Sequence, residues 1–203
     1  ATHGIAVNYW MKGDFGFARG FDSYDLQGES LETGRPISLA ALEIIDAHRA
    51  NEEPLFLFLQ FFDAHSASSE ITDNTLPYYS PPDLRRDVAP DRNDPTYCDP
   101  ESGCATGYLV GANAGRTEVS DATRATLAEL YRRSVTDLDH SLSILFDGLR
   151  KRGLYEGALI VVTSDHGEEF GEHGMFLHHQ TYDETLAIPL FIKFPDGRGA
   201  GRR

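Results

Sequence analysis

Residues 55–62 constrain the fold more than any other part of this chain. They read Leu-Phe-Leu-Phe-Leu-Gln-Phe-Phe and are apolar at nearly every position. A strand with one solvated face alternates apolar and polar residues, whereas an unbroken apolar run indicates burial on both faces. Such strands are typical of parallel sheets that lie between two layers of helices. The run therefore predicts an α/β fold with a mostly parallel central sheet and helices on both faces.

Three more segments have the composition of buried strands, at residues 4–9, 158–163 and 189–194. Each is a short apolar run bounded by polar or turn-forming residues, which is the pattern of strands in a sheet interior. We therefore expect the four segments to be strands of one parallel sheet.

Two amphipathic helices are predicted between these strands. The first covers residues 38–48, and the second begins near Asp121 and ends before Gly153. Asp121 can cap the start of the second helix, and Gly153 can end it in a left-handed turn. Apolar residues recur at spacings of three and four, which places them on one face of each helix. The residues expected to face the core are Leu39, Leu42 and Ile45 in the first helix and Leu127, Tyr131, Val135, Leu138, Leu142, Leu145 and Leu149 in the second.

Residues 66–118 are dense in Pro, Asp, Gly and Ser and show no sustained period. They predict a long surface excursion within a single domain that covers residues 1–203, and excursions of this kind often shape a substrate cleft. Cys98 and Cys104 lie inside it, with five residues between them. The two cysteines can close a small disulfide or remain reduced, and the sequence favours neither state.

The charge of the chain excludes one class of partner. Its 203 residues include 32 Asp plus Glu against 18 Lys plus Arg, which gives a formal net charge of −14. A surface that binds nucleic acid needs basic residues, so no nucleic-acid partner is expected. No apolar run approaches the ~20 residues that cross a bilayer, so no transmembrane segment is expected in this chain. The sequence predicts no particular oligomeric state.

Two of the predicted strands are each followed by an Asp and a His. Asp63 and His65 follow one strand, and Asp165 and His166 follow another. Because the carboxyl ends of parallel strands meet at one edge of a sheet, these side chains are expected to converge. A carboxylate oxygen and an imidazole nitrogen can together hold a divalent cation, which makes Asp165 and His166 candidate metal ligands. The alternative is that Asp165 caps a turn and the histidines bond to backbone.

A third group of histidines follows the Asp165–His166 pair. Glycines allow tight turns in this segment, so the loop can fold back and bring His178 or His179 to a ligand held by the pair. A metal with imidazoles around it is a receptor for a tetrahedral oxyanion such as sulfate or phosphate. Four neighbouring residues are instead expected to face water: Glu168, Glu169, Glu172 and His173.

In several motifs, the chain resembles the sulfatase family of the alkaline phosphatase-like superfamily. The most specific match is Thr-Ser-Asp-His-Gly-Glu at residues 163–168, and Gly-Phe-Ala-Arg-Gly-Phe-Asp at residues 16–22 is similar to another family segment. Residues 54–65 are similar to the strand that delivers a substrate-binding histidine. Residues 131–153 look like the long helix before the metal strand, and residues 182–190 resemble the entry to the following strand. The resemblance covers nearly the whole chain and implies an alkaline phosphatase-like fold.

The resemblance also implies roles for individual residues. Asp165 and His166 would be ligands of a divalent cation, most often calcium in sulfatases. His65 would bind the sulfate group or the leaving oxygen. His178 would sit where many members carry a His or Lys that touches the sulfate, with His179 as the substitute. The implied activity is metal-dependent hydrolysis of a sulfate ester, with a small molecule or a glycan as substrate and with His65 and His178 as catalytic and substrate-binding residues.

The chain departs from the family pattern at the nucleophile. Sulfatases act through a formylglycine made from Cys or Ser in a Cys/Ser-x-Pro-x-Arg motif, and an acidic pair upstream of that motif completes the metal site. Neither is found before Gly4. Cys-Asp-Pro at residues 98–100 matches only in part, since the Arg is missing and the segment lies downstream of His65. We therefore expect this chain to be the C-terminal part of a catalytic domain, without its nucleophile and inactive alone. Members also often carry Pro-His-x-Pro-Tyr where residues 64–67 read Ala-His-Ser-Ala.

The sequence leaves two alternatives to sulfate-ester hydrolysis open. The same superfamily includes phosphodiesterases, phosphonate hydrolases and phosphoglycerol transferases, for which Mn²⁺, Mg²⁺ or Zn²⁺ would replace Ca²⁺. A bare Thr or Ser nucleophile would favour these enzymes. The other alternative is a non-catalytic protein that binds an anionic glycan. The resemblance implies a periplasmic or extracellular protein, and a disulfide between Cys98 and Cys104 would support that location.

Overall fold

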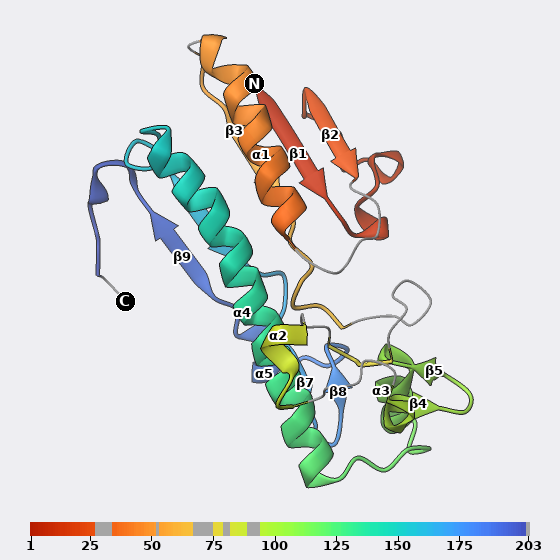
Figure 1. Cartoon of the computed structure of the whole chain (residues 1–203). Helices are drawn as coiled ribbons and strands as arrows, with labels where there is room; N and C mark the ends of the chain where they lie inside the picture. Colours follow the sequence, from red (N-terminus) through yellow and green to blue (C-terminus); the bar gives the residue numbers. More distant parts are fainter. Residues whose placement is uncertain (27–33, 52, 67–74, 79–81, 89–93, 202–203) are drawn as a thin grey trace.

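The structure is a computed structural model that describes residues 1–26, 34–51, 53–66, 75–78, 82–88 and 94–201 (Figure 1). The strands are β1 (Thr2–Ala6), β2 (Ser23–Leu26), β3 (Phe56–Leu59), β4 (Cys98–Asp99), β5 (Gly103–Cys104), β6 (Ile160–Thr163), β7 (Glu169–Phe170), β8 (Phe176–Leu177) and β9 (Leu190–Lys193). The α-helices are α1 (Arg35–His48), α2 (Pro82–Arg85), α3 (Thr106–Asn113), α4 (Asp121–Lys151) and α5 (Asp183–Leu186). Short 3-10 helices cover Tyr9–Met11, Gly13–Phe15, Arg49–Asn51, Pro95–Tyr97 and Pro195–Gly197. Among the described residues, no helix is both long and apolar enough to cross a membrane.

A parallel sheet of three strands in the order β2–β1–β3 forms the amino-terminal part of the fold. The central strand β1 pairs with both neighbours, and His3 lies opposite Ser23 on one side and Leu57 on the other. A parallel sheet packed against helices confirms the predicted α/β class. Strand β2 was not predicted, because Ser-Tyr-Asp-Leu is not an apolar run and only such runs identify buried strands.

The expectation of a single parallel sheet is wrong for two of the four predicted strands. β6 pairs with β9, and the two strands are antiparallel, with Ile160 opposite Lys193 and Thr163 opposite Leu190. They form a sheet of their own within the described residues. A parallel connection needs a long crossover, usually a helix. The segment between β6 and β9 holds only the β7–β8 hairpin and the four-residue helix α5.

Helix α1 covers only one face of the parallel sheet. Leu57 and Leu59 of β3 pack with the apolar cluster that α1 forms. Phe56 and Phe58 point to the opposite face. There the Phe21 ring makes tilted contacts with both rings, and Phe56 remains 56% exposed. The expectation of helices on both faces therefore does not hold for this sheet among the described residues. An unbroken apolar run shows that a strand can be buried on both faces, but the element that covers each face comes from elsewhere.

Helix α1 begins three residues earlier than predicted and presents a different face. Pro36 stands in its first turn, a position where a missing N–H costs nothing. Leu39 is 42% exposed, so its predicted core position is wrong. The buried face of α1 consists of Ile37, Ser38, Ala41, Leu42 and Ile45.

Helix α4 has the predicted bounds and runs along α1 at its carboxyl end (Figure 1). Gly153 follows it with a φ of 69°, as predicted, whereas the side chain that caps its start belongs to Ser120 and not to Asp121. Leu127 and Leu145 are buried, as predicted, whereas Val135 is exposed. The other buried residues of this row lie one position before predicted ones: Leu130, Ser134, Ser141 and Gly148. Small residues in this row let the helices approach closely: the Ser38 hydroxyl donates to the Ser141 carbonyl at 2.6 Å.

Residues 66–118 are not only a surface excursion. The described part of this segment contributes buried side chains to a second core at the amino-terminal half of α4. The prediction failed because these residues are scattered among polar ones and show no period. Residues 67–74, 79–81 and 89–93 of the segment lie outside the described residues. The core consists of Leu76, Tyr78, Tyr97, Tyr108, Leu109, Leu127, Leu130, Phe176 and Leu177.

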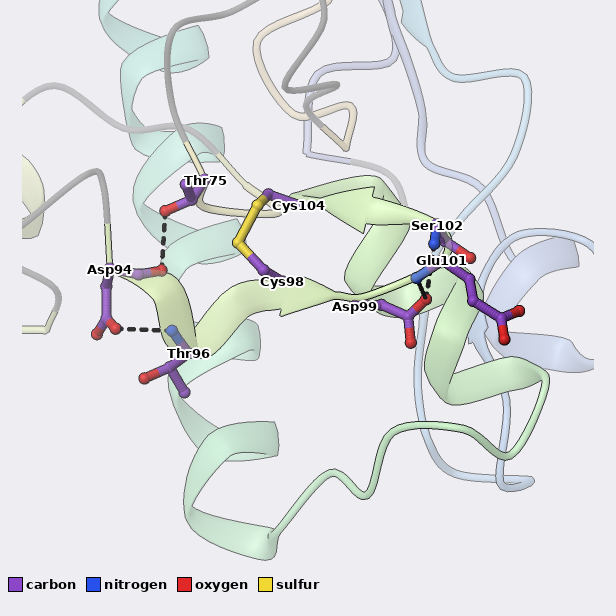
Figure 2. Close-up of a disulfide and its surroundings, with 8 residues drawn as sticks. All are labelled: Thr75, Asp94, Thr96, Cys98, Asp99, Glu101, Ser102 and Cys104. Atoms are coloured by element: carbon purple, nitrogen blue, oxygen red, sulfur yellow. Dashed lines mark hydrogen bonds between the residues drawn. A yellow bond between two sulfur atoms is a disulfide. The ribbon is translucent and has the colours of Figure 1, made fainter.

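A disulfide between Cys98 and Cys104 closes the short β4–β5 hairpin (Figure 2). Next to it, the carboxylate of Asp99 accepts hydrogen bonds from the backbone N–H groups of Glu101 and Ser102, which lie in the turn of the hairpin (Figure 2). Arg116 and Thr117 donate to the same carboxylate from beyond α3. These hydrogen bonds, that from Ser102 foremost, hold the pKa of Asp99 well below its usual value.

Candidate functional site

Three histidines from distant parts of the chain meet at one point. His65 follows β3, His166 follows β6, and His178 follows β8. The rings of His166 and His178 stack with centroids 3.9 Å apart, and the His65 ring lies 5.3 Å from His178 and 6.4 Å from His166. Each histidine offers a ring nitrogen, and the three nitrogens lie within 4.8 Å of one another. The ends of β3 and β6 therefore converge as predicted, although the two strands belong to different sheets.

The three rings are oriented in the same way, through Nδ1. Nδ1 of His65 lies 2.8 Å from the Ser66 carbonyl oxygen, and Nδ1 of His166 lies 2.8 Å from the Gly167 carbonyl oxygen. Nδ1 of His178 lies 3.1 Å from Oε2 of Glu168. A neutral imidazole that donates from Nδ1 carries its lone pair on Nε2. The arrangement thus leaves the Nε2 atoms to bind a cation or a substrate.

His65 is held in an apolar setting. Its ring stacks on Phe62 with centroids 4.1 Å apart and an interplanar angle of 14°. Burial lowers the pKa of the His65 imidazole below its usual value, the hydrogen bond to Ser66 opposes that shift, and His178 adds to it. Burial therefore favours the neutral form of the His65 ring.

Glu168 contacts His178, and Tyr78 contacts Glu168; neither contact was predicted from the sequence. The side chain of Glu168 is 4% exposed and accepts a 2.7 Å hydrogen bond from the Tyr78 hydroxyl. Tyr78 is fully buried and reaches this place because it forms an isolated β-bridge with Ser66, the residue after His65. The pKa of Tyr78 is raised well above its usual value by burial and by the Glu168 charge, so its hydroxyl remains a donor.

The expectation that the acidic residues after His166 face water is wrong for Glu168 and Glu169. Both carboxylates are enclosed, and Glu169 is fully buried. Glu172 is exposed, as expected, and His173 is exposed but paired with Glu184. A local sequence that is rich in Glu and Gly predicts solvent exposure, and only the pairing of β7 with β8 and the backbone bonds to residues 184–185 enclose the two side chains.

Asp165 lies at the edge of the histidine cluster. Its side chain is 85% exposed, and its Oδ1 lies 3.7 Å from Nε2 of His166. Two atoms bound to one calcium at roughly 2.4 Å are about 3.4 Å apart or more when the bonds meet at a right angle or wider. The spacing of Asp165 and His166 therefore fits two ligands of one cation.

Two other polar residues near the cluster have different roles. Asp63 is buried and accepts a 2.6 Å hydrogen bond from the backbone N–H of Gly34, so it caps the start of α1. His179 is exposed and its ring lies 5.4 Å from that of His178. Of the two adjacent histidines, the structure brings His178 into the cluster. The disulfide also removes Cys98 as a candidate nucleophile, since its sulfur is bonded to that of Cys104.

Comparisons with known proteins show which family the chain resembles. The family model described as Sulfatase matches residues 32–203. The chain is 37% identical over 71 residues to an N-acetylglucosamine-6-O-sulfatase of Bacteroides thetaiotaomicron, a match that covers 35% of this chain and 13% of that protein. It is 23% identical over 207 residues to an arylsulfatase of Clostridium perfringens, which covers 98% of this chain and 38% of that protein.

A solved structure shares the fold. It is that of a protein in complex with its substrate D-glucosamine-2-N,6-O-disulfate, and it matches with a TM-score of 0.56 at 16% identity over 96% of this chain and 53% of that chain. The matched parts of the chain cover 13% and 38% of the lengths of the two curated relatives, so the chain spans only part of each.

Proposed function

The chain belongs to the sulfatase family, and we propose that it contributes the histidine-lined part of an active site that hydrolyses a sulfate ester. The observation that carries the proposal is the meeting of His65, His166 and His178 within 4.8 Å. Because the chain spans only part of its curated relatives, we assign the nucleophile and the remaining metal ligands to residues outside these 203. The exposed Phe56 and Val161, on two separate sheets, support further chain packing against these strands.

Family membership implies a divalent cation, and Asp165 and His166 are the residues that would hold it. We propose Ca²⁺, with further oxygen ligands from outside the 203 residues, since calcium takes six to eight ligands that are mostly oxygen. When bound, the cation would neutralise negative charge on the sulfate oxygens. The 3.7 Å spacing of Asp165 Oδ1 and His166 Nε2 supports a shared cation.

His178 is suited to act as a hydrogen-bond donor. The carboxylate of Glu168, 3.1 Å from Nδ1, accepts a hydrogen bond from the His178 ring and fixes its orientation. The Tyr78 hydroxyl fixes that carboxylate from the other side. In its protonated form His178 donates from Nε2 to a sulfate oxygen or to the leaving oxygen.

His65 is suited to the complementary role. Burial favours its neutral form, and its Nδ1 already bonds the Ser66 carbonyl. The Nε2 lone pair can accept a proton from a hydroxyl group at the reacting centre, and the protonated ring can return that proton to the departing alcohol. The two histidines thus divide the donor and acceptor roles between them.

We propose a sulfated sugar as the substrate. Support comes from a relative named for N-acetylglucosamine-6-O-sulfate and from the neighbour solved with a glucosamine disulfate. We further propose that the protein works in the periplasm or outside the cell, where the Cys98–Cys104 disulfide is stable.

Activity of the full-length protein tests the proposal. We would compare glucosamine-6-sulfate and an aryl sulfate with an aryl phosphonate monoester and a phosphodiester, each with and without Ca²⁺. The highest kcat/KM is expected with a sulfate ester. A higher value for the phosphonate ester or the phosphodiester would move the protein to phosphoryl transfer. Binding of the sulfated sugar with no turnover of any ester would make it a non-catalytic glycan-binding protein.

Adjacent histidines provide a matched pair of variants. His178→Asn is expected to lower kcat about 100-fold or more, the usual contribution of a general acid or base. His179→Asn makes the same chemical change one residue away on an exposed side chain and is expected to leave kcat within about twofold. Equal losses in the two variants would contradict the role given to His178.

A further inference from the structure

Glu169 is an acidic residue buried in the interior of the fold. The residue is fully buried in β7, opposite Leu177 of β8. Both of its carboxylate oxygens are buried, and neither has a hydrogen-bond partner among the described residues. A buried carboxylate without a partner is strongly unfavourable, so such groups are normally paired with a charge or coordinate a metal. Burial accordingly raises the pKa of Glu169.

Two further ligand-type side chains face this carboxylate. His173 and Glu184 each offer one atom, and these atoms lie within 4.8 Å of one another and of a Glu169 oxygen. Nε2 of His173 and Oε2 of Glu184 are 3.1 Å apart. Two donors bound to one tetrahedral zinc at about 2.0–2.1 Å stand roughly 3.3 Å apart, so the observed spacing is close to that of two ligands on one ion.

Local structure holds the three side chains in place. The backbone N–H groups of Gly167 and Glu168 donate to the carbonyls of Thr185 and Glu184 at 2.7 and 3.1 Å, which fixes the segment before β7 against α5. The His173 ring stacks on Tyr182 with centroids 3.8 Å apart. Backbone hydrogen bonds and a ring contact therefore hold the three residues near one another.

The hairpin turn sets the position of His173. The Gly171 N–H donates to the Met175 carbonyl at 2.8 Å, and the Gly174 N–H donates to the Gly171 carbonyl at 3.1 Å. Gly171 and Gly174 have φ values of 91° and 75°, a region that favours glycine. The turn thus directs His173 back toward α5.

We propose that Glu169, His173 and Glu184 bind a divalent transition metal, with Zn²⁺ the best match, at a site separate from the histidine cluster. One imidazole and two carboxylates are a ligand set that zinc accepts. Successive side chains in extended chain point to opposite sides. The carboxylate of Glu168 therefore contacts His178, whereas that of Glu169 lies at the second site.

Zinc titration of the full-length protein tests the proposal. In a His65→Ala/His178→Ala background, which dismantles the first cluster, one equivalent of Zn²⁺ is expected to remain bound. Adding Glu169→Gln or Glu184→Gln to that background should weaken this binding at least about 100-fold. Asp183→Asn is the matched control, since Asp183 is an exposed acid one residue before Glu184 in the same helix. The proposal is overturned if no zinc remains in the background variant, or if Glu169→Gln and Asp183→Asn bind zinc alike.

Thermal unfolding separates metal binding from a folding defect. In metal-free buffer, Glu169→Gln is expected to melt at or above the wild-type temperature, because it replaces a buried carboxylate with a neutral amide. Zn²⁺ should raise the melting temperature of the wild type and of Asp183→Asn but not that of Glu169→Gln. A zinc-induced rise of equal size in Glu169→Gln would show that the ion binds elsewhere and would overturn the assignment.

Discussion

The buried hydroxyl of Tyr78 donates a 2.7 Å hydrogen bond to Oε1 of Glu168, 90 positions later in the chain. This bond links the core under α4 to the histidine cluster, since the other oxygen of Glu168 holds His178. The orientation of a candidate catalytic residue thus depends on a tyrosine with no direct contact to the reacting groups.

Tyr78→Phe removes this hydrogen bond and keeps the ring. The free energy of unfolding is expected to fall by about 1–3 kcal/mol, because the buried carboxylate loses a donor. The turnover of the full-length enzyme should also fall, and its pH profile should shift, because His178 loses the fixed orientation of Glu168. Tyr131→Phe, a neighbouring ring in T-shaped contact with Tyr78, is the control and should leave the pH profile unchanged. An unaltered profile in Tyr78→Phe would contradict the positioning role.

Asp137 is expected to destabilise the fold at neutral pH. Burial in α4, with Asp63 as the next contribution, raises the pKa of Asp137 to about 6. Folding therefore favours the protonated form of Asp137. The loss of stability is absent below the unfolded pKa of about 3.9, grows as the pH rises, and is complete above the folded pKa of about 6. A shift of two pKa units corresponds to about 3 kcal/mol, which solvent screening of this half-exposed group reduces to about 1 kcal/mol.

Asp137→Asn should therefore raise the melting temperature at pH 7.5 and have little effect at pH 4.5. Asp139→Asn, an exposed residue of the same helix, is the matched control. A gain at pH 7.5 of the same size in both variants would indicate a general effect of net charge instead.

Asp99 is expected to show the opposite pH dependence. Its pKa is lowered, first by the backbone hydrogen bond from Ser102, so its contribution to stability is present above the unfolded pKa of about 3.9 and is lost as the pH falls below that value. At pH 7, Asp99→Asn should melt at a lower temperature than the wild type. Under acid conditions, the melting temperatures of the two proteins should lie closer together. Glu101→Gln, whose carboxylate is 73% exposed, should change the melting temperature little at either pH.

The disulfide should stabilise the β4–β5 hairpin and its surroundings. A Cys98→Ser/Cys104→Ser double variant is expected to lose about 2 kcal/mol of unfolding free energy in guanidinium titrations, from the loop entropy that the cross-link removes. Reductant should bring the wild type down to the double variant and leave the variant itself unchanged. A wild-type midpoint that does not respond to complete reduction would rule out this contribution.

The sequence by itself determined the elements with a strong period or a specific motif. α4 could be placed to within a residue at both ends, because its apolar spacing and Gly153 are local signals. β3, β6 and β9 lie within the apolar runs that predict them. The histidines at the ends of β3 and β6 could be singled out because their chemistry follows directly on a buried strand.

Only the tertiary structure decided which partner each element meets. An apolar run encodes burial but not direction, so β6 and β9 could be located while their antiparallel pairing could not. The same limit applies to side chains: Glu168 and Glu169 lie in a polar stretch, and contacts from Tyr78, His173 and Glu184 decide their environment. A charged residue is buried only where distant groups compensate it, and those groups are brought near by the fold, not by the local sequence.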